Sequence, residues 1–180
     1  MDLRVKRTIN SIKEAFFELR KKKSLNKISV KELSELAMIN KATFYLHYRD
    51  IFELSDKLEN EMINKIIDEV RGQPFSYTET DLRRFSEIIS RAVIKNSDEI
   101  NILFSGFENN AFINRLEDSL KIYIFTAFPK IRNTTENNLL LTFLIQGAFH
   151  TFLRNDSVRA DILEDQTIDM TVTLADAYIF

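Results

Sequence analysis

A short segment around position 45 gathers side chains that recognise other molecules through hydrogen bonds. Asn40 is a favourable helix N-cap, and Phe44 and Tyr48 follow at a spacing that predicts the inner face of a short helix over residues 41–48. The outer face offers an ammonium, a hydroxyl with its methyl group, a phenol and an imidazole. These groups belong to Lys41, Thr43, Tyr45 and His47.

Two further helices are expected to position this segment. Ser29 and Glu32 form the S-x-x-E pattern of a capping box and predict a short helix over residues 30–37. A longer amphipathic helix is expected over residues 5–20, because its apolar side chains recur at spacings of three and four. Two short helices joined by a turn and braced by a longer one make a helix-turn-helix.

The formal charge is divided unevenly along the chain. Its net value is −2, but residues 1–50 carry 12 Lys and Arg against 6 Asp and Glu, a net of +6, and residues 51–180 carry −8. A short helix with donors and acceptors on its outer face fits the DNA major groove, and the positive charge suits phosphates. DNA binding is therefore the leading hypothesis. The alternative is a three-helix fold whose basic face is merely solvated.

Residues 28–54, ISVKELSELAMINKATFYLHYRDIFEL, resemble the helix-turn-helix signature of the TetR/AcrR transcriptional repressors. The resemblance covers roughly residues 5–58. It implies that Thr43 and Lys41 face bases and that Tyr45 and His47 contact phosphates, as does Ser29 from the start of its helix. Ser29 as a simple cap, His47 as a packed side chain and Lys41 as a solvated charge stay open as alternatives. The expected DNA-binding residues are Ser29, Lys41, Ala42, Thr43, Tyr45, His47 and Arg49.

The sequence departs from the family pattern at two positions. Met38 stands where the family usually has a turn glycine, and a positive φ there would cost a non-glycine residue roughly 1 kcal/mol. Ile51 replaces a usual lysine at the start of the fourth helix, so one phosphate contact is lost or passes to Arg49.

The composition and periodicity predict an all-α fold of about nine helices. Three glycines and two prolines in 180 residues are too few for the many tight turns of a β-rich fold. Polar breaks divide the remaining chain into further helices, expected at 51–71, 80–95, 98–107, 110–128, 135–154 and 161–178. We expect a DNA-binding domain over residues 1–50 and a helical ligand-binding and dimerisation domain over residues 51–180.

The expected helix 135–154 is apolar around its whole circumference, so one side should bury against its own domain and the other against a second subunit. A wholly intramolecular core is the alternative. The expected dimer contacts are Leu141, Leu144, Ala148, Phe152, Val172 and Ala175. The expected ligand pocket comprises Phe104, Phe107, Tyr123, Phe143, Gln146 and His150, a set that also suits an ordinary core. The C-terminal helices are loosely similar to those of the dihydroxyacetone kinase operon regulators.

Other function classes find little support in the sequence. The chain has no cysteine and two distant histidines, which argues against disulfides and a Cys/His zinc site, and it contains no nucleophile or phosphate-loop motif. We expect no secretory signal, because residues 1–17 lack an uninterrupted apolar core followed by a small-residue cleavage site. The longest uncharged run, 137–153, is too short to span a membrane. We therefore expect a cytoplasmic, cofactor-free, non-enzymatic homodimer: a ligand-responsive repressor that binds a near-palindromic double-stranded DNA operator and an unknown effector. A helical protein–protein adaptor is the alternative.

Overall fold

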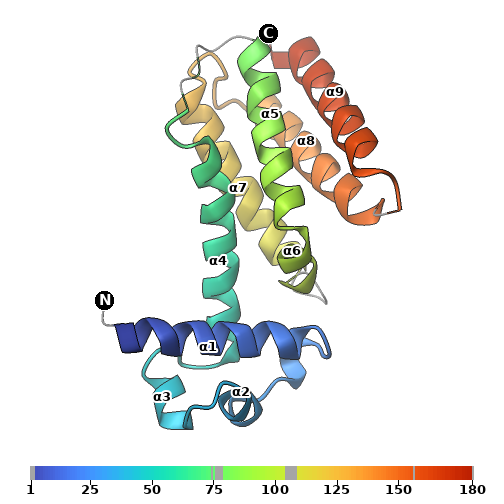
Figure 1. Ribbon diagram of the computed structural model, residues 1–180. Helices are drawn as coiled ribbons and strands as arrows, with labels where there is room; N and C mark the ends of the chain where they lie inside the picture. Colours follow the sequence, from blue (N-terminus) through green and yellow to red (C-terminus); the bar gives the residue numbers. More distant parts are fainter. Residues whose placement is uncertain (1–2, 74, 76–78, 104–108, 156, 180) are drawn as a thin grey trace. The chain divides into compact units, whose positions relative to one another are not determined.

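A computed structural model describes residues 3–73, 75, 79–103, 109–155 and 157–179. These residues form nine α-helices and one short 3-10 helix, and none of them lies in a β-strand (Figure 1), which confirms the all-α prediction. The helices are α1 (Leu3–Arg20), η1 (Leu25–Lys27), α2 (Val30–Leu36), α3 (Lys41–Tyr45), α4 (Ile51–Val70), α5 (Glu79–Lys95), α6 (Ser97–Leu103), α7 (Asn109–Ala127), α8 (Thr135–Arg154) and α9 (Ala160–Ile179).

The observed helix bounds follow the periodicity and cap signals closely, with one difference near the site. Helix α3 ends at Tyr45, three residues earlier than expected, because the amide of His47 donates to the carbonyl of Phe44 in a tighter turn. His47 therefore lies in the segment that follows the helix. The part of the expected helix 98–107 beyond Leu103 lies outside the described residues.

The chain divides into two compact units. Unit 1 comprises residues 1–62 and 98–112, and unit 2 comprises residues 63–97 and 113–180. The compact unit that contains the helix-turn-helix thus extends beyond residue 50 and takes in α6. The functional division at residue 50 stays a prediction.

Unit 1 is built around the contacts of α1 with α2 and of α2 with α3 (Figure 1). Its fully buried large side chains include Ile12, Phe16, Leu33, Phe44 and Leu54. Each comes from the apolar face that the 3.6-residue period defines, so burial of these faces holds the short helices in place.

A buried arginine joins two distant parts of unit 1. The side chain of Arg20 is only 3% exposed, and its guanidinium donates to the carbonyl oxygens of Lys23 at 3.3 Å and Leu103 at 3.4 Å. The end of α1 is thereby linked to the end of α6.

Unit 2 packs α9 against both α5 and α8 (Figure 1). Leu82, Leu144 and Ala175 form a buried cluster from these three helices. A polar group ties α7 to α8, because the Glu117 carboxylate accepts from Lys121 Nζ at 2.6 Å and from Gln146 Nε2 at 2.8 Å. Burial opposes ionisation of Glu117, but the hydrogen bonds from Lys121, Thr142 and Gln146 outweigh it and lower its pKa.

Candidate nucleic-acid interface

Helix α2 begins at the expected serine cap. Ser29 Oγ accepts a hydrogen bond from the backbone N–H of Glu32 at 3.2 Å. The Glu32 carboxylate accepts from Lys23 Nζ at 2.7 Å, which ties the start of α2 to the segment after α1. Because a hydroxyl both accepts and donates, exposed Ser29 keeps its proton for a further acceptor.

The turn between α2 and α3 is a Schellman motif centred on Met38. The amide of Met38 donates to the carbonyl of Glu35, and the amide of Ile39 donates to the carbonyl of Ser34. Met38 adopts a φ of 54°, the left-handed conformation that glycine favours, and it is 93% exposed. This chain therefore keeps the turn and accepts the backbone strain of a methionine within it.

Helix α3 is capped in a way that also fixes the hydroxyl of Thr43. Asn40 Oδ1 accepts from the Thr43 backbone N–H at 2.7 Å and from Thr43 Oγ1 at 2.8 Å. The hydroxyl proton is therefore engaged within the protein. Towards a ligand, Thr43 can only accept a hydrogen bond or present its methyl group.

The expected base-contacting and phosphate-contacting residues differ in exposure. Lys41, Ala42, Tyr45 and Arg49 are exposed, while Thr43 and His47 are half-buried. On the opposite side of α3, Phe44 is fully buried against Tyr48, with ring centroids 5.6 Å apart. The inner and outer faces thus follow the sequence pattern, whereas contact with DNA stays a prediction.

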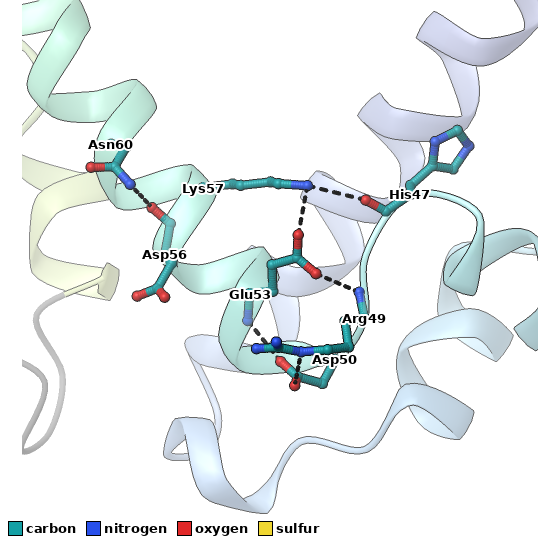
Figure 2. Close-up of polar contacts among 7 residues, drawn as sticks. All are labelled: His47, Arg49, Asp50, Glu53, Asp56, Lys57 and Asn60. Atoms are coloured by element: carbon teal, nitrogen blue, oxygen red, sulfur yellow. Dashed lines mark hydrogen bonds and ion pairs between the residues drawn. The ribbon is translucent and has the colours of Figure 1, made fainter.

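Two charged side chains of α4 hold the segment that follows α3, a feature that sequence reasoning missed. Lys57 Nζ donates to the carbonyl oxygen of His47 at 3.2 Å, and Glu53 Oε2 accepts from the Arg49 amide at 2.6 Å. Lys57 also pairs with Glu53 at 2.9 Å and lies 4.9 Å from the centre of the Tyr48 ring. Figure 2 shows the His47 imidazole on the far side of its carbonyl from Lys57. The i, i+4 spacing of Glu53 and Lys57 was the signal in the sequence that could have predicted this ion pair.

Asp50 caps α4, and its surroundings favour ionised carboxylates. Asp50 Oδ1 accepts from the Glu53 amide at 2.8 Å, and this bond, with help from the Arg49 guanidinium, holds the pKa of Asp50 below its usual 3.8. The Arg49 amide and Lys57 lower the pKa of Glu53 from 4.5. Burial raises the pKa of Tyr48 above 10.0, and the negative charges of Glu61 and Glu53 add to this shift.

Some exposed basic residues of unit 1 form ion pairs and others do not. Lys21 pairs with Glu18 at 2.6 Å, and Arg49 pairs with Asp50 at 3.2 Å. Within the part of the chain that the structure describes, Lys22, Lys27 and Lys41 make no ion pair, and all three are exposed. Exposed pairs are weak, so Arg49 can still exchange Asp50 for a phosphate. Ile51, by contrast, is buried at the start of α4.

Unit 2 contains an apolar cavity of about 100 Å³. Four of the six expected pocket residues are among those that the structure describes. Phe104 and Phe107 lie outside the described residues, and Tyr123 donates from its hydroxyl to the carbonyl of Val70 at 2.8 Å. Phe143 and His150 are exposed, and Gln146 binds Glu117. None of these four described side chains lines the cavity.

The expected dimer residues lie largely inside unit 2. Leu141, Leu144, Val172 and Ala175 are buried within their own chain, and Ala148 and Phe152 are half-buried. All of them except Val172 line the cavity. The exposed apolar residues of α8 and α9 include Leu139, Phe143, Ile162, Met170 and Tyr178. Contact of the expected residues with a partner subunit stays a prediction.

Within the described part of the chain no helix has the length and apolar character needed to cross a lipid bilayer.

No protein-family model and no curated protein sequence matches this chain. Solved structures do. A tetR-family transcriptional regulator from Streptomyces coelicolor superposes with a TM-score of 0.65 at 15% identity, covering 99% of this chain and 83% of that chain. A TetR-like transcriptional regulator from Rhodococcus sp. RHA1 gives 0.65 at 18% identity, with 95% and 94% covered. The fatty acid degradation regulator FadR from Bacillus halodurans gives 0.59 at 12% identity, with 92% and 94% covered. The chain therefore has the fold of the TetR-family transcriptional regulators.

Proposed function

We propose that this protein is a DNA-binding transcriptional regulator of the TetR family. The observation that carries the proposal is α3: an Asn40-capped helix with a buried Phe44 on one side and exposed Lys41, Ala42 and Tyr45 on the other. The surrounding residues 1–50 have a net charge of +6. A short, rigid helix on a basic unit is suited to the major groove.

The contacts of α3 support a distinct proposed role for each polar side chain. Lys41 makes no ion pair among the described residues and is available to donate to guanine O6 and N7. Thr43, whose proton is held by Asn40, would accept from an adenine or cytosine amino group or place its methyl against thymine. Ser29, Tyr45, His47 and Arg49 are the proposed phosphate contacts, and Lys22 adds a sequence-independent one.

We further propose that the protein binds a near-palindromic operator as a homodimer. Exposed apolar side chains of α8 and α9 support this, since Phe143 is 64% exposed and lines a shallow groove together with Gly147 and Met170. Gly147 is exposed, and nothing lies within 4 Å of where its Cβ would be, so another helix can approach closely there. Burying this face against its symmetry mate would remove it from water.

Regulation by a small effector is supported by the cavity of unit 2, which lies among α5, α7, α8 and α9. An effector would favour a conformation in which the two recognition helices no longer match major grooves about 34 Å apart, and so release the operator and end repression. To shift occupancy strongly, it must bind that conformation several kcal/mol more tightly than the DNA-bound one.

Selection of binding sites from a random DNA pool tests the proposal. We expect two inverted half-sites whose centres lie one helical turn apart, with an affinity that falls steeply as salt rises. Absence of DNA binding even at low salt would overturn it and favour the protein–protein adaptor. Selection of unpaired single half-sites would retain DNA recognition but contradict dimeric binding.

A further inference from the structure

Thr167 carries a buried hydroxyl without a hydrogen-bond partner. Its side chain is 4% exposed, and Oγ1 has no partner in the described structure. A buried hydroxyl that makes no hydrogen bond costs free energy, because it has lost its water. Thr167 is among the residues that line the cavity of unit 2, and it also lines the groove of α8 and α9, so a molecule bound in the cavity would contact this residue.

Other threonines within helices form a hydrogen bond to their own helix that Thr167 does not form. The hydroxyls of Thr8, Thr126, Thr151 and Thr171 each donate to the carbonyl four residues earlier, at 2.7–3.0 Å. This is the usual way for a helical threonine to satisfy its hydroxyl. Thr167 is on the same helix as Thr171 and yet leaves its hydroxyl unpaired.

The cavity wall offers hydroxyl groups and no charge. Its polar side chains are Ser86, Ser90, Thr167 and Thr171, and the other lining residues are aliphatic or phenylalanine. A carboxylate or an ammonium group entering this wall would lose its hydration without gaining an opposite charge. An alkyl chain would instead be transferred from water to apolar surroundings, and comparable apolar cavities bind small hydrocarbons.

We infer that the cavity of unit 2 takes an uncharged, mainly apolar molecule bearing one hydrogen-bonding oxygen, such as an alcohol, ketone or ester, and that Thr167 binds this oxygen. The inference rests on the proposed function, because it identifies the chemical class of the proposed effector. Thr167 would set the orientation of the ligand, and the apolar wall would supply most of the affinity.

Binding of matched six-carbon probes to the full-length protein without DNA tests the inference. We expect amide NMR titrations to show 1-hexanol binding more tightly than hexanoate or hexylammonium. Thr167→Val should weaken 1-hexanol about three- to tenfold and leave hexane unchanged, as loss of one hydrogen bond predicts. Thr167→Ser should retain the preference for the alcohol.

Thr171→Val is the matched control, because Thr171 lines the same cavity but already donates its proton to the carbonyl of Thr167. It should leave the binding of 1-hexanol close to that of the wild type. Tighter binding of hexanoate, an unchanged 1-hexanol affinity in Thr167→Val, or no binding of any probe up to its solubility limit would overturn the inference. Since no DNA is present, these results are independent of the DNA-binding proposal.

Discussion

The hydroxyl of Thr43 has one proton, and it donates this proton in a hydrogen bond to Asn40 Oδ1. Because of this contact, Thr43 can act only as a hydrogen-bond acceptor towards DNA, which narrows the set of bases that it would recognise in the proposed interface. Periodicity could place Thr43 on the outer face of α3, and the family resemblance implied contact with bases. Neither could show that the Thr43 hydroxyl donates to Asn40, because this hydrogen bond depends on the side-chain conformation of Asn40.

Thr43→Val should therefore lower specificity at one base pair of each half-site. Valine keeps the methyl group and the shape but cannot accept from an amino group, so discrimination should fall by about 1–3 kcal/mol at that position. Competition binding against operators substituted at each position measures this loss, and Thr43→Ser should largely restore the wild-type profile.

Lys22→Ala is the matched comparison for a non-specific contact. It should weaken all operators equally and reduce the slope of log affinity against log salt by about one. If both substitutions changed the base profile in the same way, the assignment of Thr43 to a base and of Lys22 to a phosphate would be wrong.

Met38→Gly should stabilise the folded protein. Glycine removes the cost of a positive φ, which exceeds the extra entropy it gives the unfolded chain, so we expect a gain of about 0.5–1 kcal/mol. The exposed methionine side chain adds almost no packing to offset this gain. Chemical denaturation measures the change, and Met38→Ala, which retains the strain, should not reproduce it.

Helix α4 holds the segment that follows α3 through the charged side chains of Glu53 and Lys57, and this makes the stability of the folded protein depend on pH. Because the pKa of Glu53 in the folded state lies below the unfolded value of 4.5, the folded state binds fewer protons in that range. The stability from its contacts is complete above 4.5 and is lost as pH falls through the lowered pKa. Asp50 acts in the same direction.

Glu53→Gln should therefore lower the melting temperature at pH 7, and this difference should shrink as the pH falls through the lowered pKa of Glu53 and the wild-type carboxylate becomes protonated as well. Melting curves of the two proteins across this range measure the difference. A constant difference between them at every pH would show that the contacts of Glu53 with Arg49 and Lys57 do not depend on its charge.

The limits of sequence prediction are clearest in α8. Caps and periodicity gave its bounds, because Thr134 caps it and apolar residues fill it. They could not separate its faces, since apolar residues surround the helix on all sides. The residues expected to contact a partner, such as Leu141 and Leu144, line the cavity, while Phe143, expected in the pocket, is exposed. Which side of α8 is buried and which is exposed depends on the positions of α5, α7 and α9 around it.

At the scale of the whole molecule, we expect dimerisation to depend on Phe143. Phe143→Glu places a charge on the proposed interface in both subunits, and a loss of about 2 kcal/mol in each would weaken association by on the order of a thousandfold. Sedimentation should then show monomers, and binding to the full operator should fall to the level of a half-site.

Ile122→Glu is the control, because Ile122 on α7 is 69% exposed and lies outside the groove of α8 and α9. It should remain dimeric. Dissociation of this variant, or a stable dimer of Phe143→Glu, would show that the dimer interface does not lie on the proposed face of α8 and α9.

Unit 1 is discontinuous in sequence, and this limits how the protein can be divided into fragments. A fragment ending at residue 62 would contain α1, α2, α3 and the first part of α4 but would lack residues 98–112. Arg20, which is buried in the full chain, would then lose the Leu103 carbonyl that accepts from its guanidinium. Removing one partner of a buried charged group is costly. We therefore expect residues 1–62 alone to be less stable than the full chain, and a fusion that restores the α6 segment through a short linker to recover part of that stability.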